Sequence, residues 1–137
     1  MGFQALKPAL RAPAMKRVLI VEDQADIRKL IRMTLEFEPY EIFEAADGAE
    51  GLRKAVEVVP DLMLLDVMMP GDLDGLQVCS QVRANPTLQG TRVVLLTARG
   101  QVKDRDAGQH AGADDYLIKP FSPLQLIEAI ERLMPEV

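Results

Sequence analysis

Features that define several other classes of protein are scarce or absent in this chain. Its 137 residues include one cysteine, Cys79, which excludes an internal disulfide framework and a multi-cysteine zinc site. No apolar run approaches the ~20 residues of a membrane-spanning helix, and the first residues lack the apolar core of a signal peptide. No internal repeat, low-complexity tract or interdomain linker is visible. We therefore expect a soluble, cytoplasmic protein with one domain.

Positive charge is scarce beyond the first residues. Residues 18–137 hold 12 of the 16 lysines and arginines and all 21 acidic residues, which gives a net charge of −9. Such an acidic body lacks the basic face of a nucleic-acid-binding protein, so we expect this chain to bind neither nucleic acid nor membrane. Residues 1–15 contain two prolines and no acid, which predicts a flexible leader before a folded domain at residues 16–137.

Short apolar segments alternate with amphipathic ones along the folded part. Four are almost continuously apolar, as strands buried on both faces are, and one alternates with glutamates like an edge strand. The expected strands are 18–21, 40–45 (the edge strand), 62–65, 93–96 and 116–118. Five helices are expected, the most polar at 103–111, and the first has an apolar stripe of Ile27, Leu30, Ile31, Thr34 and Leu35. This alternation predicts an α/β fold with a doubly wound parallel sheet.

Polar side chains of a few types follow the four central strands. In chain order these residues are Glu22 and Asp23, Asp66, Thr97, and Lys119. The carboxyl ends of parallel strands meet at one rim, where ligands bind. Each residue alone has an ordinary explanation; Asp23, for example, could cap the first helix. Together, clustered carboxylates need a cation such as Mg²⁺, and a lysine and a hydroxyl can hold phosphoryl oxygens, so the set predicts phosphoryl transfer to a carboxylate.

The order and spacing of these residues resemble the receiver domain of two-component response regulators. The matching segments, within about residues 16–135, are 22–23 (ED), 66–70 (DVMMP), 74–75 (DG), 97–98 (TA) and 111–121 (AGADDYLIKPF). The resemblance implies a stand-alone receiver with five helices and the flavodoxin-like strand order 2-1-3-4-5. It also implies a phosphoryl group received from a histidine kinase or a phosphotransfer protein. Such a domain is not an enzyme in the usual sense, since it catalyses only its own phosphorylation and dephosphorylation.

The resemblance also implies an acceptor and a metal site. Asp66 is the expected phosphoacceptor. Mg²⁺ is expected on the carboxylates of Asp23 and Asp66 and on the backbone carbonyl of Met68, with Glu22 reaching the ion through water. The acidic pair departs from the commoner Asp-Asp, because its first member is Glu22.

The remaining implied roles concern phosphoryl binding and the switch. Thr97 is expected to donate a hydrogen bond to the phosphoryl group and Lys119 to pair with it, across a cis Lys119–Pro120 bond. Tyr116 occupies the aromatic switch position, and it is expected to turn inward when Thr97 moves. This movement is expected to remodel the face of the fourth helix, fifth strand and fifth helix, where a downstream protein or a second copy would bind.

Two further departures and two rival functions concern the loops after the strands. Residues 71–74 make the loop before Gly75 one residue longer than usual, and Met68 and Arg99 leave the phosphoryl lifetime open.

A phosphatase of the haloacid dehalogenase type would need an aspartate where Met68 stands. A flavodoxin-like cofactor binder would need a Ser/Thr/Gly-rich loop at residues 22–26, where three acids would repel a phosphate.

Overall fold

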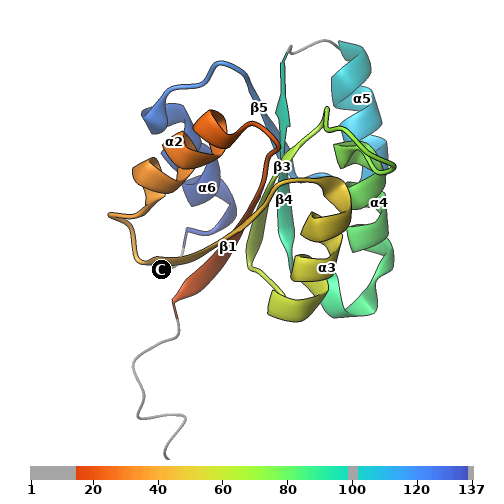
Figure 1. The fold of residues 1–137 in the computed structure, drawn as a ribbon, viewed down its shortest axis with the longest axis horizontal. Helices are drawn as coiled ribbons and strands as arrows, with labels where there is room; N and C mark the ends of the chain where they lie inside the picture. Colours follow the sequence, from red (N-terminus) through yellow and green to blue (C-terminus); the bar gives the residue numbers. More distant parts are fainter. Residues whose placement is uncertain (1–14, 99–101, 136–137) are drawn as a thin grey trace, which may run out of the picture.

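The computed structural model describes residues 15–98 and 102–135, which form alternating strands and helices (Figure 1). The strands are β1 (Lys16–Val21), β2 (Tyr40–Ala45), β3 (Leu62–Asp66), β4 (Arg92–Thr97) and β5 (Asp115–Ile118). The α-helices are α2 (Ala25–Leu35), α3 (Gly48–Val58), α4 (Gly75–Ala84), α5 (Val102–Ala111) and α6 (Pro123–Leu133), with a 3-10 turn η1 (Pro86–Leu88) before β4. The predicted leader and Arg99 lie outside the described residues, apart from Met15.

The five strands form one parallel sheet in the order β2-β1-β3-β4-β5, which confirms the expected fold class and strand order. β2 lies at the edge, as its alternating glutamates predict. The register brings the strand ends level with one another: Asp66 is beside Leu96, and Thr97 is beside Ile118. The residues that follow these strands therefore emerge at one rim of the sheet.

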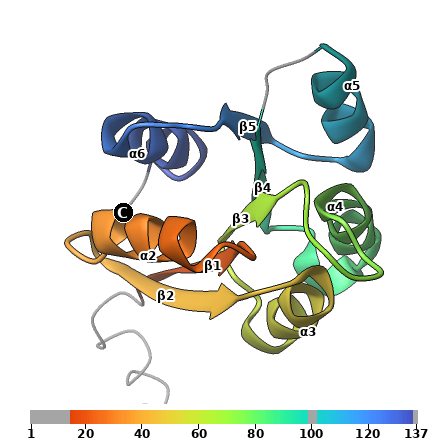
Figure 2. The ribbon, with the colours of Figure 1, turned by 45° about the horizontal axis from the view of Figure 1, so that its top comes forward.

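Helices cover both faces of the sheet. Figure 2 shows α2 and α6 on one side and α3, α4 and α5 on the other. Successive residues of a strand point to opposite faces, so Val18 and Ile20 pack in one core and Leu19 and Val21 in the other. This two-sided burial is the reason that β1 is apolar throughout.

The buried face of α2 differs in one position from the expected stripe. On α2, Ile31 and Leu35 are buried, but Leu30 is 47% exposed, so the expected apolar stripe is narrower than its spacing indicates.

Within the described ranges, none of the helices has the length and apolar character needed to cross a lipid bilayer.

Candidate functional site

The rim at the carboxyl ends of the strands brings the predicted acidic residues together. One carboxylate oxygen from each of Glu22, Asp23 and Asp66 lies within 4.8 Å of the others, and we call these residues the acidic cluster. Glu22 is fully buried and Asp66 is 4% exposed. Asp23 does not cap the first helix, because the residue at the N-cap of α2 is Gln24, whose side chain makes no capping hydrogen bond. The ordinary explanation for Asp23 is therefore wrong.

Lys119 completes this site from the end of β5. Its Nζ lies 2.8 Å from Glu22 Oε1 and 3.2 Å from Asp66 Oδ1. The Lys119 backbone N–H donates a hydrogen bond to the Thr97 carbonyl over 2.7 Å, which joins the ends of β5 and β4. Thr97 is 6% exposed at the end of β4. The Lys119–Pro120 peptide bond is cis, as predicted.

Among the residues that the structure describes, negative charge at this site exceeds positive charge. Three carboxylates and one ammonium sum to a net charge of −2 when all are ionised. Burial, with the carboxylates of Asp23 and Glu22 beside it, raises the pKa of Asp66 to about 7, although Lys119 opposes this shift. Burial lowers the pKa of Lys119, but Glu22 and Asp66 outweigh burial and raise it above its ordinary value. Lys119 therefore stays charged, and Asp66 takes up a proton in the metal-free protein only as the pH falls through about 7.

The donor set fits a hard divalent cation. Carboxylate oxygens are the ligands that Mg²⁺ prefers, and an ion of charge +2 balances the excess of −2. Lys119 Nζ lies closer to Glu22 (2.8 Å) than to Asp66 (3.2 Å), so Asp23 and Asp66 are the carboxylates more readily available to a metal. The backbone N–H of Met68 lies 3.3 Å from Asp66 Oδ1 and donates to it, and the metal-binding role of its carbonyl stays a prediction.

The loop after β3 holds Asp66 closely despite its additional residue. Asp74 and Gln77 form a reciprocal capping box at the start of α4. A Cβ on Gly75 would lie 2.1 Å from the carbonyl oxygen of Asp66, so only glycine allows α4 to begin this close to the end of β3. Leu73 packs against the core beneath α3 and α4. The longer loop therefore leaves the start of the helix intact.

Comparisons with known proteins identify the family. The family model described as "Response regulator receiver domain" matches residues 18–131. The chain is a receiver domain. Receiver domains of two-component response regulators are phosphorylated on an aspartate. The match begins within β1, covers the other four strands and includes every residue predicted to act at the site.

Relatives of this receiver domain differ in length and in role. It is 45% identical over 118 residues to the transcriptional regulatory protein ResD of Bacillus subtilis. The aligned region covers 86% of this chain and 48% of ResD. The chain thus spans about half the length of the curated relatives it matches. Chemotaxis protein CheY4 of Vibrio cholerae superposes with a TM-score of 0.84 at 34% identity, over 88% of this chain and all of that one.

A further neighbour bears on the metal. The receiver domain of a sensor histidine kinase from Pseudomonas aeruginosa superposes with a TM-score of 0.81 at 30% identity, over 90% of this chain and 100% of that chain. Its structure has a magnesium ion coordinated in the active-site cleft. The acidic cluster of the present receiver domain offers carboxylate oxygens, the kind of ligand that Mg²⁺ prefers.

The predicted switch residue lies apart from the acidic cluster, on β5. The half-buried ring of Tyr116 packs against the core on the α5 side, and the Arg105 guanidinium of α5 lies 4.8 Å from the ring centroid. This cation–π contact was not foreseen from the sequence, because it joins two elements whose packing the spacing does not reveal. A cavity of about 370 Å³ between α5 and β5 is lined by both residues.

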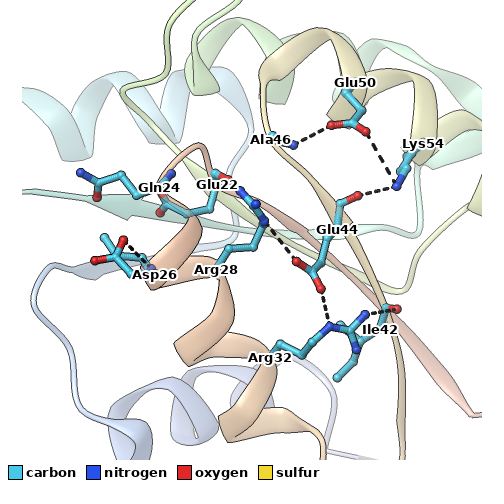
Figure 3. A network of polar contacts seen from close by, with 11 residues as sticks. Glu22, Gln24, Asp26, Arg28, Arg32, Ile42, Glu44, Ala46, Glu50 and Lys54 are labelled. Carbon is cyan, nitrogen blue, oxygen red and sulfur yellow. Dashed lines mark hydrogen bonds and ion pairs between the residues drawn. The ribbon is translucent and has the colours of Figure 1, made fainter.

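A second charged network, also missed from the sequence, contacts the backbone of Glu22 (Figure 3). We call it the outer cluster, and its members are Arg28, Arg32, Glu44, Glu50, Arg53 and Lys54. Arg28 and Arg32, one turn apart on α2, both contact the carboxylate of Glu44 on β2. The glutamates of β2 indicated only an edge strand. The spacing of Arg28 and Arg32, four residues apart on one face of α2, was the available signal that they share an acidic partner.

Proposed function

We propose that Asp66 is the phosphoacceptor of this receiver domain. The observation that carries the proposal is the acidic cluster itself: three carboxylates on adjacent parallel strand ends, with the Lys119 ammonium 3.2 Å from Asp66. Asp66 is the member at the end of the central strand β3, and it is buried between the other two carboxylates and Lys119. Its reactive oxygen is therefore surrounded by groups that can position a phosphoryl group.

The donor we propose is a phosphohistidine on a histidine kinase or a phosphotransfer protein. A carboxylate oxygen of Asp66 forms a bond to phosphorus, and the phosphorus–nitrogen bond to the imidazole breaks. Attack requires the ionised carboxylate, and Lys119 favours this form of Asp66. In the product, Lys119 pairs with one phosphoryl oxygen, and the Thr97 hydroxyl donates a hydrogen bond to another.

Mg²⁺ is the cofactor we propose for this site. Asp23, Asp66 and the Met68 carbonyl would hold it, and Glu22 would contribute through water. When bound, the ion neutralises negative charge on the carboxylates and on the phosphoryl oxygens. The net charge of −2 at the site and the magnesium in the Pseudomonas aeruginosa neighbour support this assignment. The same site would catalyse only transfer to and loss from Asp66, and the domain would act on no separate substrate.

The output surface we propose is formed by α5, β5 and α6. Thr97 ends β4, Tyr116 lies in the adjacent β5, and Arg105 of α5 contacts its ring, so a movement at Thr97 reaches this surface through few contacts. A downstream protein or a second copy of the chain would bind there. We place the receiver at residues 16–137, in the cytoplasm, without nucleic-acid or membrane contacts of its own; the acidic body at residues 18–137 supports this assignment.

Phosphorylation by acetyl phosphate with Mg²⁺ tests the acceptor. We expect intact-protein mass spectrometry to show one added phosphoryl group on the wild type and none on Asp66→Ala. Asp72→Ala, which removes an exposed acid from the loop after β3, is the matched control and should be labelled like the wild type. A phosphoryl group that maps to another residue of the wild type would defeat the assignment.

A further inference from the structure

Arg28 links the acidic cluster to the outer cluster. Its Nη1 donates a hydrogen bond to the backbone carbonyl oxygen of Glu22 over 2.6 Å, and its Nε contacts Glu44 Oε1 at 3.1 Å. Figure 3 shows the guanidinium between these two partners. The Arg28 side chain is 20% exposed, so both contacts are largely shielded from water.

The carbonyl that Arg28 binds belongs to the peptide bond between Glu22 and Asp23. Fixing this peptide plane fixes the backbone from which two of the three clustered carboxylates emerge. The opposite side of the same backbone is held by the Glu22 N–H, which donates to the Ala45 carbonyl over 3.1 Å. The segment after β1 is therefore held from α2 and from β2.

Glu44 holds Arg28 in place for this contact. One oxygen of its carboxylate binds Arg28 and the other binds Arg32, while Lys54 donates to its backbone carbonyl. The carboxylate orients the Arg28 fork and also compensates part of its positive charge. Arg28 can therefore lie beside a cation site with less repulsion than an unpaired arginine would exert.

We propose that Arg28 is a positioning residue for the metal site. Held by Glu44, it orients the Glu22–Asp23 peptide and so preorganises the acidic cluster for Mg²⁺. The inference rests on the proposed function, because it assumes that the cluster binds Mg²⁺. Groups that orient metal ligands typically contribute about 10–100-fold to metal affinity.

The sign of the effect separates positioning from simple electrostatics. Removing a nearby positive charge strengthens the binding of a divalent cation if charge alone matters. Positioning predicts the opposite result: Arg28→Met should weaken Mg²⁺ binding about tenfold although it removes a cation. Arg32→Met is the matched control, because it removes the same charge from the same carboxylate without a contact to Glu22.

Isothermal titration calorimetry of the full chain with MgCl₂ measures these dissociation constants. We expect the Arg28→Met value to rise about tenfold and the Arg32→Met value to change by less than about twofold. Tighter or unchanged binding by Arg28→Met would overturn the inference, as would equal weakening in both variants. If the wild type binds no Mg²⁺, the proposed function fails instead.

A conservative variant covers the case in which Arg28→Met does not fold. Arg28→Lys keeps the charge, but a single ammonium lacks the fork that contacts Glu44 and the Glu22 carbonyl together. We expect its dissociation constant for Mg²⁺ to rise several-fold, by more than that of Arg32→Lys. Equal dissociation constants for Mg²⁺ in the two lysine variants would overturn the inference even if the methionine variants do not fold.

Discussion

The acidic cluster and the outer cluster meet at the backbone of Glu22, and they differ in burial and in the sign of their net charge. The acidic cluster with Lys119 sums to −2, and two of its carboxylates are buried. The outer cluster has four cations and two carboxylates, a sum of +2, and the Glu44 side chain is 30% exposed there. Excess negative charge on buried carboxylates favours a bound cation, whereas ion pairs nearer the surface brace the fold. The comparison therefore separates a binding site from a structural network.

The largest difference is expected when each cluster loses a cation. Lys119→Met leaves three clustered carboxylates without a positive partner, and breaking a buried pair in this way costs about 3–5 kcal/mol. Arg32→Met removes a half-exposed cation and should cost less than about 1 kcal/mol. Urea unfolding in EDTA measures both free energies. Equal losses would show that the two clusters do not differ as described.

Removing a carboxylate should have opposite effects in the two clusters. Asp23→Asn relieves repulsion in the acidic cluster, so we expect the metal-free protein to gain about 1 kcal/mol while its affinity for Mg²⁺ falls. Glu44→Gln weakens two ion pairs and should lower the free energy of unfolding by about 1 kcal/mol. Thermal melts with and without Mg²⁺ compare the variants. A loss of stability in metal-free Asp23→Asn would contradict the charge account.

The pH dependence of stability should show the strain at Asp66. The folded pKa of about 7 lies above the ordinary value of 3.8, so the folded state binds the proton more tightly than the unfolded state. Without metal, this contribution is fully present below pH 4 and is lost as the pH rises toward 7 and beyond. Asp66→Asn should remove this decline, which unfolding curves at pH 5 and pH 8 measure. Parallel profiles for both proteins would argue against strain at Asp66.

The smallest expected effect is conformational. Binding of beryllofluoride should change amide hydrogen exchange most, outside the loops around Asp66, within residues 97–121, because α5 is the most polar of the described helices. The region of α2 braced by Glu44 should change little. Changes confined to α2 and α3 would move the output surface to the opposite side of the domain.

Much of the fold and site could be predicted because both depend on local pattern. Continuous apolar runs identified the strands, and the parallel sheet then required Asp66, Thr97 and Lys119 to meet at one rim. The two contacts of Arg28 could not be predicted, since they depend on how α2 lies against β2. The sequence also left Asp23 open to two explanations, a helix cap or a metal ligand, because it does not show where the helix begins. Only the backbone at Gln24 shows where the helix begins.

The phosphate analogue beryllofluoride gives the most direct test of the central claim, that unbalanced charge around Asp66 forms an Mg²⁺-dependent phosphoryl site. Fluorine NMR of the full chain should show a bound signal for the wild type and for Asp72→Ala in the presence of Mg²⁺. The signal should vanish for Asp66→Ala and when EDTA removes the metal. A bound signal that persists in Asp66→Ala, or in the wild type without Mg²⁺, would contradict the account.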